Sequence, residues 1–171
     1  MNELTYALPV KAKEIFEELF EGECCESNVY LQLSVMLANA GFQDGANWAW
    51  QKSQDERGAA KRWADYAQTR GVVISMEKYE EEKVTATDMK SAVLEAGKLE
   101  LKALERLESA CRMMFDVDLL SYSEIQSYLS SQKWELDEMQ KMWTVFSQLE
   151  SFEDQYETQR TYFLPVESIP C

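Results

Sequence analysis

Four long segments of this chain repeat apolar residues at intervals of three and four, the period of one face of an α-helix. The chain has 171 residues but only six glycines and three prolines, so little interrupts these segments. Helices with one apolar face bury it by packing against one another, and this length suffices for one domain with a sizeable core. We therefore expect an all-α protein that folds as a single domain over residues 1–171.

Capping residues and turns predict where these helices begin and end. The expected helices span residues 9–38, 45–70, 88–115 and 123–150. Gly41 suits the cap after the first helix, because glycine tolerates the left-handed backbone conformation found there. Asp44 and Asp88 are expected to cap the second and third helices, and either Ser121 or Ser123 the fourth.

The connection between the second and third helices is unusually long. Residues 72–87 break the helical period, and they are more than a turn between antiparallel helices needs. A crossover along the bundle explains the length and gives the four helices an up-down-down-up course. A strand pair beginning at Val72 is the other interpretation. Residues 151–171 are expected to form a short fifth helix or a docked tail.

The net charge of −14 disfavours nucleic acid and anionic membrane surfaces as partners. The charge attracts cations, although an acidic solvated surface explains it equally well. There is no signal-peptide pattern at the amino end and no apolar run long enough for a membrane span, so we expect a cytoplasmic protein. The chain has no histidine, which excludes Ser-His-Asp catalysis, Cys-His catalysis and imidazole-based zinc sites.

The four cysteines are expected to be free thiols, as in a reducing compartment. Cys24 and Cys25 are adjacent within the first predicted helix, so one of them can face the core. A thiolate there is a candidate metal ligand. The alternative, which we favour, is that both are small core side chains.

Three glutamates interrupt the apolar stripes near the midpoints of three helices: Glu23, Glu56 and Glu100. A helix of about 27 residues is roughly 40 Å long, so three midpoints can meet at one level of a bundle. Carboxylates a few ångströms apart in a low dielectric cannot all stay ionised unless a cation neutralises them. Iron, manganese, magnesium and calcium accept such oxygen ligands. The alternative is that each glutamate lies at the edge of its stripe and extends into solvent.

Four segments resemble the ferritins, most closely the non-haem bacterial type. They are Glu23-x6-Tyr30-Leu-x-Leu-Ser34, Gly45-Ala-Asn-Trp48 with Lys52 through Glu56, Lys98-Leu-Glu100, and Thr161-Tyr-Phe-Leu164. They occur in the order and spacing of that family, and the resemblance covers nearly the whole chain. It implies a ferritin-like four-helix bundle with a long crossover. It also implies a homo-oligomeric cage of 24 subunits, either alone or mixed with other ferritin subunits.

The resemblance also implies a non-haem iron centre that binds Fe(II) and Fe(III), with one or two ions per chain. The family's metal-ligating glutamates fall on Glu23, Glu56 and Glu100. Neighbouring acidic positions of the family fall on Asp55, Glu135 and Glu138.

Several positions depart from the family pattern. The histidine position holds Ala59, the helix-four glutamine position falls on Leu136, and a further glutamate position falls on Met139. Arg57 stands where the haem-binding branch carries its methionine ligand, so no haem is expected. Methyl and isobutyl groups cannot ligate a metal, and these departures therefore predict weaker metal binding.

The function expected from this resemblance is iron binding and storage, with weakened ferroxidase activity, the oxidation of Fe(II) by oxygen or peroxide. The alternative is a structural or assembly subunit of ferritin type with no functional metal centre. A di-metal oxygenase is a third interpretation, but it would need a second Glu-x-x-His motif and the chain contains none.

Overall fold

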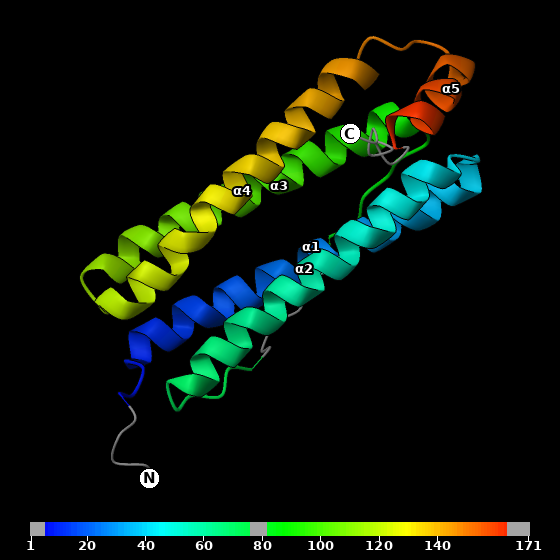
Figure 1. Ribbon diagram of the computed structural model, residues 1–171. Helices are drawn as coiled ribbons and strands as arrows, with labels where there is room; N and C mark the ends of the chain where they lie inside the picture. The colour runs from blue at the N-terminus through cyan, green and yellow to red at the C-terminus, as the bar shows by residue number, and fades with distance from the viewer. Residues whose placement is uncertain (1–5, 76–81, 164–171) are drawn as a thin grey trace, which may run out of the picture.

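A computed structural model describes residues 6–75 and 82–163, and within these residues the chain forms five helices and no strand. The helices are α1 (Val10–Ala40), α2 (Gln43–Thr69), α3 (Met89–Phe115), α4 (Leu119–Phe146) and α5 (Phe152–Tyr162). Helices α1 to α4 form a bundle, and α5 lies at one end of it (Figure 1). The predicted all-α four-helix bundle with a short C-terminal helix is confirmed. No helix in the described ranges is long and apolar enough to span a membrane.

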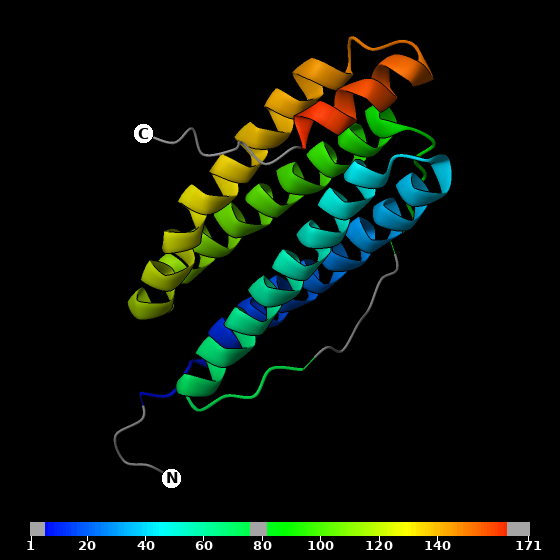
Figure 2. The ribbon, with the colours of Figure 1, turned by 45° about the vertical axis from the view of Figure 1, so that its right-hand side comes forward.

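The four helices follow the predicted up-down-down-up course. Helix α1 packs antiparallel to α2, and α3 packs antiparallel to α4 (Figures 1 and 2). The crossover follows α1: the backbone N–H of Ser75 donates to Glu17 (3.1 Å), and the side-chain amide of Gln32 donates to the carbonyl of Glu82 (2.9 Å). No strand forms at Val72. The crossover therefore starts α3 at the end of the bundle where α2 also begins.

The predicted caps hold for two helices. Gly41 ends α1 with a φ of 93°, a left-handed conformation that glycine adopts without strain. Asp88 accepts a hydrogen bond from the N–H of Ser91 (2.8 Å), and the Ser91 side chain completes a capping box at the start of α3. At α2 the cap residue is Phe42, and Asp44 lies within the first turn instead of capping it.

The predicted start of α4 is wrong by one helical turn. The helix begins at Leu119, and its cap is Asp118, whose carboxylate accepts a hydrogen bond from the N–H of Ser121 (3.1 Å). Arg70 at the end of α2 fixes this carboxylate, with N–O distances of 3.0 and 3.3 Å. Asp118 therefore caps α4 and also ties it to the end of α2. The two residues in this contact, Arg70 and Asp118, are 48 residues apart in the chain.

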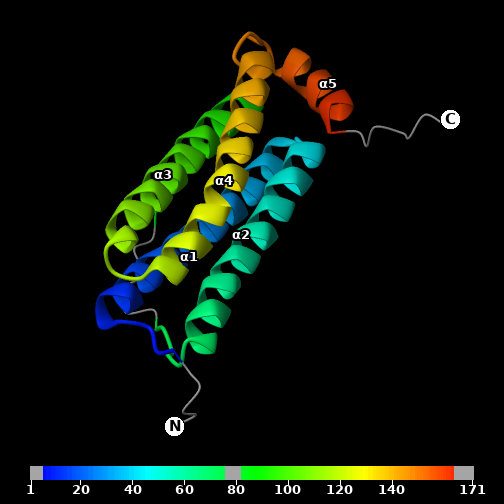
Figure 3. The same cartoon turned by 60° about the vertical axis from the view of Figure 1, so that its left-hand side comes forward.

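Helix α5 contributes two buried glutamines that satisfy backbone groups of other helices. The side-chain oxygen of Gln159 accepts from the N–H of Gly45 in the first turn of α2 (3.0 Å). Gln155 accepts from the N–H of Lys90 in the first turn of α3 (3.0 Å). Helix N-terminal N–H groups lack partners within their own helix. Helix α5 thus closes the end of the bundle where α2 and α3 begin (Figure 3).

The apolar core consists of two separate clusters. One includes Val29 to Leu37 of α1 and Met139 to Phe146 of α4; the other includes Ala12 to Leu19 of α1 and Leu107 to Met114 of α3. Between them, at the middle of the bundle, the buried side chains are polar. The two apolar clusters supply the packing that holds this polar layer in place.

Candidate metal centre

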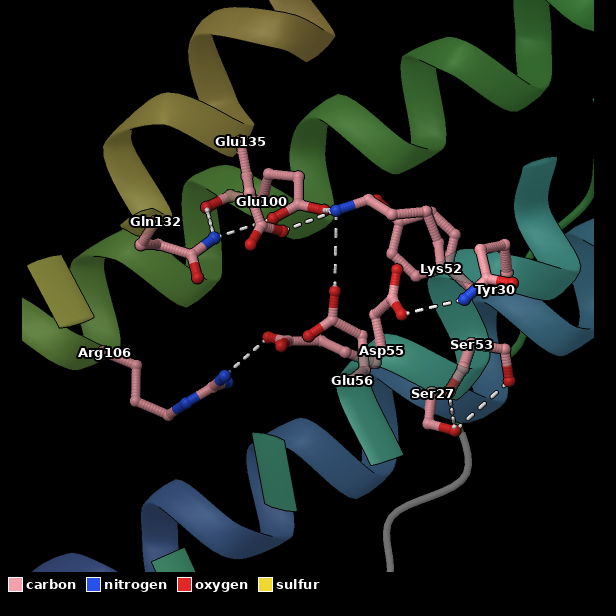
Figure 4. Close-up of polar contacts among 12 residues, drawn as sticks. Ser27, Tyr30, Lys52, Ser53, Asp55, Glu56, Glu100, Arg106, Gln132 and Glu135 are labelled. Atoms are coloured by element: carbon pink, nitrogen blue, oxygen red, sulfur yellow. Dashed lines mark hydrogen bonds and ion pairs between the residues drawn. The ribbon is translucent and has the colours of Figure 1, made fainter. Parts of the chain in front are cut away.

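Helices α1 to α4 each contribute to the polar layer. Its members are Glu23 and Glu26 from α1, Glu56 from α2, Glu100 from α3, and Gln132 and Glu135 from α4. The first four carboxyl groups are between 3% and 6% exposed. These side chains point toward one another in the bundle interior, where Figure 4 labels four of them. The fold brings Glu23, Glu56 and Glu100 close to one level of the bundle, as predicted.

The carboxyl groups form two overlapping groups. In each, carboxylate oxygens lie within 4.8 Å of one another. The first group is Glu23, Glu26 and Glu56, and the second group is Glu56, Glu100 and Glu135. Glu56 belongs to both. Each group has a donor set that suits a hard cation, in keeping with the preference of such ions for oxygen.

Lys52 lies within the second group. Its Nζ atom is 2.5 Å from a carboxylate oxygen of Glu135 and 3.3 Å from one of Glu100. The same atom lies 3.7 Å from Glu56, which follows it by one helical turn in α2. Burial alone lowers the pKa of Lys52, but the neighbouring carboxylates, Glu100 and Glu135 foremost, outweigh burial and raise the pKa above its usual value. The second group therefore holds a permanent positive charge of its own (Figure 4).

Both carboxylate oxygens of Glu100 accept hydrogen bonds. The Tyr30 hydroxyl donates to Oε1, the oxygen that also faces Lys52, and the Gln132 amide donates to Oε2 (2.7 Å). The Tyr30 ring also faces Lys52, whose Nζ lies 5.7 Å from the ring centroid.

The helix-four amide expected to be lost is present. Leu136, the position assigned to it by resemblance, instead lines an apolar groove between α3 and α4 together with Leu94 and Trp143. Gln132, one turn earlier on the same helix face, contacts Glu100 in its place. The assignment to Leu136 was therefore wrong by one helical turn. Met139 is buried in the apolar cluster next to the layer, where it offers no oxygen ligand.

Arg106 supplies the second positive charge, from α3. Its guanidinium donates to Glu26 (2.6 Å). It reaches this carboxylate across α1 at Gly22, where an added Cβ would lie 2.2 Å from the Arg106 Cζ atom. Glycine in the middle of a helix is otherwise unfavourable, so Gly22 provides the space that this ion pair requires. Glu23 accepts a hydrogen bond from the indole of Trp63 (3.1 Å).

Burial, together with the remaining negative charge, raises carboxyl pKa values in the first group. Burial, with the charges of Glu100 and Glu23, raises the pKa of Glu56 to about 10. Burial raises the pKa of Glu26 to about 8 in spite of the Arg106 charge, and it also raises the pKa of Glu23. In the metal-free protein at neutral pH, protons therefore complete the neutralisation that Lys52 and Arg106 begin.

A cavity of about 470 Å³ borders the layer between α2 and α4. Glu23, Glu56 and Glu135 form part of its wall, as does the small side chain of Ala59. Ala59 follows Glu56 by three residues, so the two lie on adjoining parts of the same helix face. The cavity gives small ions a route to the carboxyl groups and leaves room at Ala59 for a larger side chain.

The other predicted ligands lie outside both groups. Asp55 is exposed at the cavity wall, where it accepts a hydrogen bond from Gln51 (2.9 Å). Glu138 pairs with Lys141 on the surface. Cys24 and Cys25 are half-buried, and burial raises the pKa of both thiols, as expected for packing side chains. Glu82 of the crossover, which was not a predicted ligand, pairs with Lys102.

Sequence reasoning did not assign Glu26 and Gln132 of the layer to the site, nor Lys52 and Arg106, which pair with it. Glu26 had a visible signal, because it follows Glu23 by three residues on the same apolar stripe. The sequence signal for Lys52 was weaker, because it consists only of the four-residue spacing to Glu56. Arg106 had none, because its partner lies 80 residues away on another helix.

The raised carboxyl pKa values predict how the stability of the metal-free chain depends on pH. Between pH 5.5 and 8 the folded chain retains protons on Glu56 and Glu26 that the unfolded chain, with glutamate pKa near 4.5, has lost. The free energy of unfolding should therefore fall as pH rises, by up to about 1.4 kcal/mol per pH unit for each such group. Glu56→Gln should flatten this dependence and stabilise the chain at pH 8.

Urea unfolding of the metal-free chain at several pH values measures this effect. Glu105→Gln, on the exposed face of α3, is the matched control and should leave the curve unchanged. Parallel curves for the wild type and Glu56→Gln would show that Glu56 is ionised in the folded chain.

Comparison with known proteins shows which family the chain belongs to. The chain matches the ferritin-like domain over residues 12–149, which includes nearly all of α1 to α4. Two proteins named bacterial non-heme ferritin, from Bacteroides fragilis strains 638R and YCH46, are each 34% identical over 68 residues. That stretch is 40% of this chain and 43% of each relative, so the chain spans less than half the length of the relatives it matches. The domain match covers most of the chain, and the protein belongs to the ferritin-like family.

Proposed function

We propose that this chain is a ferritin-type iron-storage subunit that binds Fe(II) in the polar layer and oxidises it slowly. The observation that carries the proposal is the pair of carboxylate groups, which overlap near one buried level beside an open cavity. Membership of the ferritin-like family supports it, as do relatives named bacterial non-heme ferritin. Iron is the cargo of such a site, and each electron it loses passes to oxygen or peroxide.

Two features support slow oxidation. Oxidation of two ions at a fixed separation requires several ligands for each of them. Ala59 offers a methyl group where the family carries a histidine, so α2 provides no nitrogen ligand. Lys52 contacts all three carboxyl groups of the second group, and an entering ion competes with it there.

The second candidate function is assembly without an iron site in the bundle. The observation that favours it is that Lys52 and Arg106 already neutralise part of the layer. A bundle with its own counter-ions is stable when empty, so it needs no metal to fold. The two functions differ in whether Fe(II) binds to the layer at all.

Anaerobic Fe(II) titration separates these functions. The wild-type chain should bind Fe(II), and the triple variant Glu23→Gln, Glu56→Gln, Glu100→Gln should bind it at least about tenfold more weakly, because three carboxylate ligands become neutral amides. A triple variant at exposed glutamates, Glu14→Gln, Glu105→Gln, Glu153→Gln, controls for the loss of net charge. Equal binding by the wild type and the core variant would exclude iron handling in the layer.

Restoring the missing nitrogen ligand should accelerate oxidation. In Ala59→His the imidazole enters the cavity beside Glu56, and we expect about a tenfold or greater increase in the aerobic rate of Fe(II) oxidation. Ala59→Phe fills the same space without a ligand atom and should give no increase. A similar rate in both variants would show that the absent histidine does not limit the reaction.

We propose that the chain stores iron inside a homo-oligomeric cage, for which the family gives 24 subunits, alone or mixed with other ferritin subunits. Sedimentation or mass photometry of the purified protein should find a particle far heavier than the 19.8 kDa chain. A monomer or dimer would contradict storage, since a ferric mineral needs an enclosed space. A cytoplasmic location and the absence of haem stay predictions.

A further inference from the structure

We propose that the polar layer takes one divalent ion, in the first group, and that Lys52 acts as a tethered cation that fills the place of a second. The inference rests on the proposed function, since it assigns the ion to a position within the same site. It goes beyond that function by naming Glu26 as a ligand and Lys52 as the residue that fixes the number of ions.

The second group is saturated by the chain's own donors. Lys52 lies within ion-pair distance of all three of its carboxyl groups. Both oxygens of Glu100 are also engaged, by Tyr30 on one and Gln132 on the other. A divalent ion here would have to displace an ammonium and two hydrogen bonds together. Lys52 is only 15% exposed and is attached to α2, so it does not diffuse away once displaced.

The first group has fewer direct contacts with fixed positive charges. Arg106 contacts only one of its members, Glu26, and it does so from α3, across Gly22. Trp63 contacts one oxygen of Glu23. Glu56 has its one ion pair with Lys52 at 3.7 Å, the longest of the three Lys52 distances. In the first group, only one of the three carboxyl groups is paired directly with the Arg106 guanidinium. In the second group, all three carboxyl groups lie within ion-pair distance of the Lys52 ammonium.

The cavity between α2 and α4 is open to both groups, so the counter-ions distinguish them and access does not. Glu135 of the second group lines this cavity, as do Glu23 and Glu56 of the first. Arg106 does not line the cavity, so an ion that enters from α2 and α4 meets these carboxyl groups without having to move the guanidinium. Figure 4 shows Arg106 and Lys52 on different sides of Glu56. The two built-in cations therefore leave one place in the layer for an ion.

Binding of a single ion would also slow oxidation, independently of the lost nitrogen ligand. Two-ion chemistry depends on both ions being held at a fixed separation. If Lys52 takes the second position, the faster oxidation expected for Ala59→His comes from the improved first site alone, because that change does not create the second site. The number of bound ions is therefore a separate property from the strength of binding.

The test is the stoichiometry of a redox-stable probe. Co(II) is titrated into the metal-free full-length chain, and binding is followed by calorimetry and visible absorption. The wild type should bind one ion per chain in the layer and Lys52→Met two. Lys98→Met, which removes an exposed lysine paired with Glu95 on α3, is the control and should bind one. Core binding is identified as the part lost in the Glu23, Glu56, Glu100 triple variant.

A second comparison locates the ion without depending on Lys52→Met. Glu26→Gln should weaken binding of the single ion by about tenfold or more, while Glu135→Gln should change it by less than about twofold. Two ions in the wild type, or a larger effect from Glu135→Gln, would overturn the inference and leave iron binding intact. No ion in the wild type and one in Lys52→Met would also overturn it. No core binding in any of these chains would instead contradict the proposed function.

Discussion

A carboxylate that moves from water into a protein core loses solvation worth several kcal/mol unless nearby charges replace it. Four helices of this bundle bring five carboxyl groups to its middle, so their neutralisation is a condition for folding. Lys52 and Arg106 supply fixed charge, Tyr30, Trp63 and Gln132 supply hydrogen bonds, and protons on glutamate complete the balance. The apolar clusters on either side can form only because this balance is met between them.

Small side chains are the second requirement of the layer, because ion pairs between helices need space. Gly22 lets the Arg106 guanidinium cross α1, and Ala59 leaves the cavity open beside Glu56. Next to them the Ser27 hydroxyl donates to the carbonyl of Ser53 (2.8 Å), which holds α1 close to α2 at this level. Around the layer, small side chains thus leave room for polar contacts between helices, and large apolar side chains do not fill the space.

The fold and the convergence of three glutamates could be predicted because both depend on helical period and connection length, which a sequence displays directly. The error over Leu136 has a traceable cause. Gln132 and Leu136 lie one turn apart on the same face of α4, and the axial position of α4 decides which of them reaches Glu100. The sequence does not display that position, and the assignment to Leu136 rested on resemblance alone. Contacts between distant helices, such as Arg106 with Glu26, leave no local pattern from which to predict them.

The counter-ions that make the empty bundle stable would also set the affinity of the proposed site for iron. An ion that binds only the folded chain stabilises it by an amount that depends on its affinity, and that affinity is reduced by whatever the ion must displace. In a layer without Lys52, the metal would relieve the whole charge repulsion of Glu56, Glu100 and Glu135 and would be bound correspondingly tightly. Here a lysine provides that relief before any ion arrives. Stability without metal and tight binding of two ions are therefore opposing properties of the same three carboxyl groups.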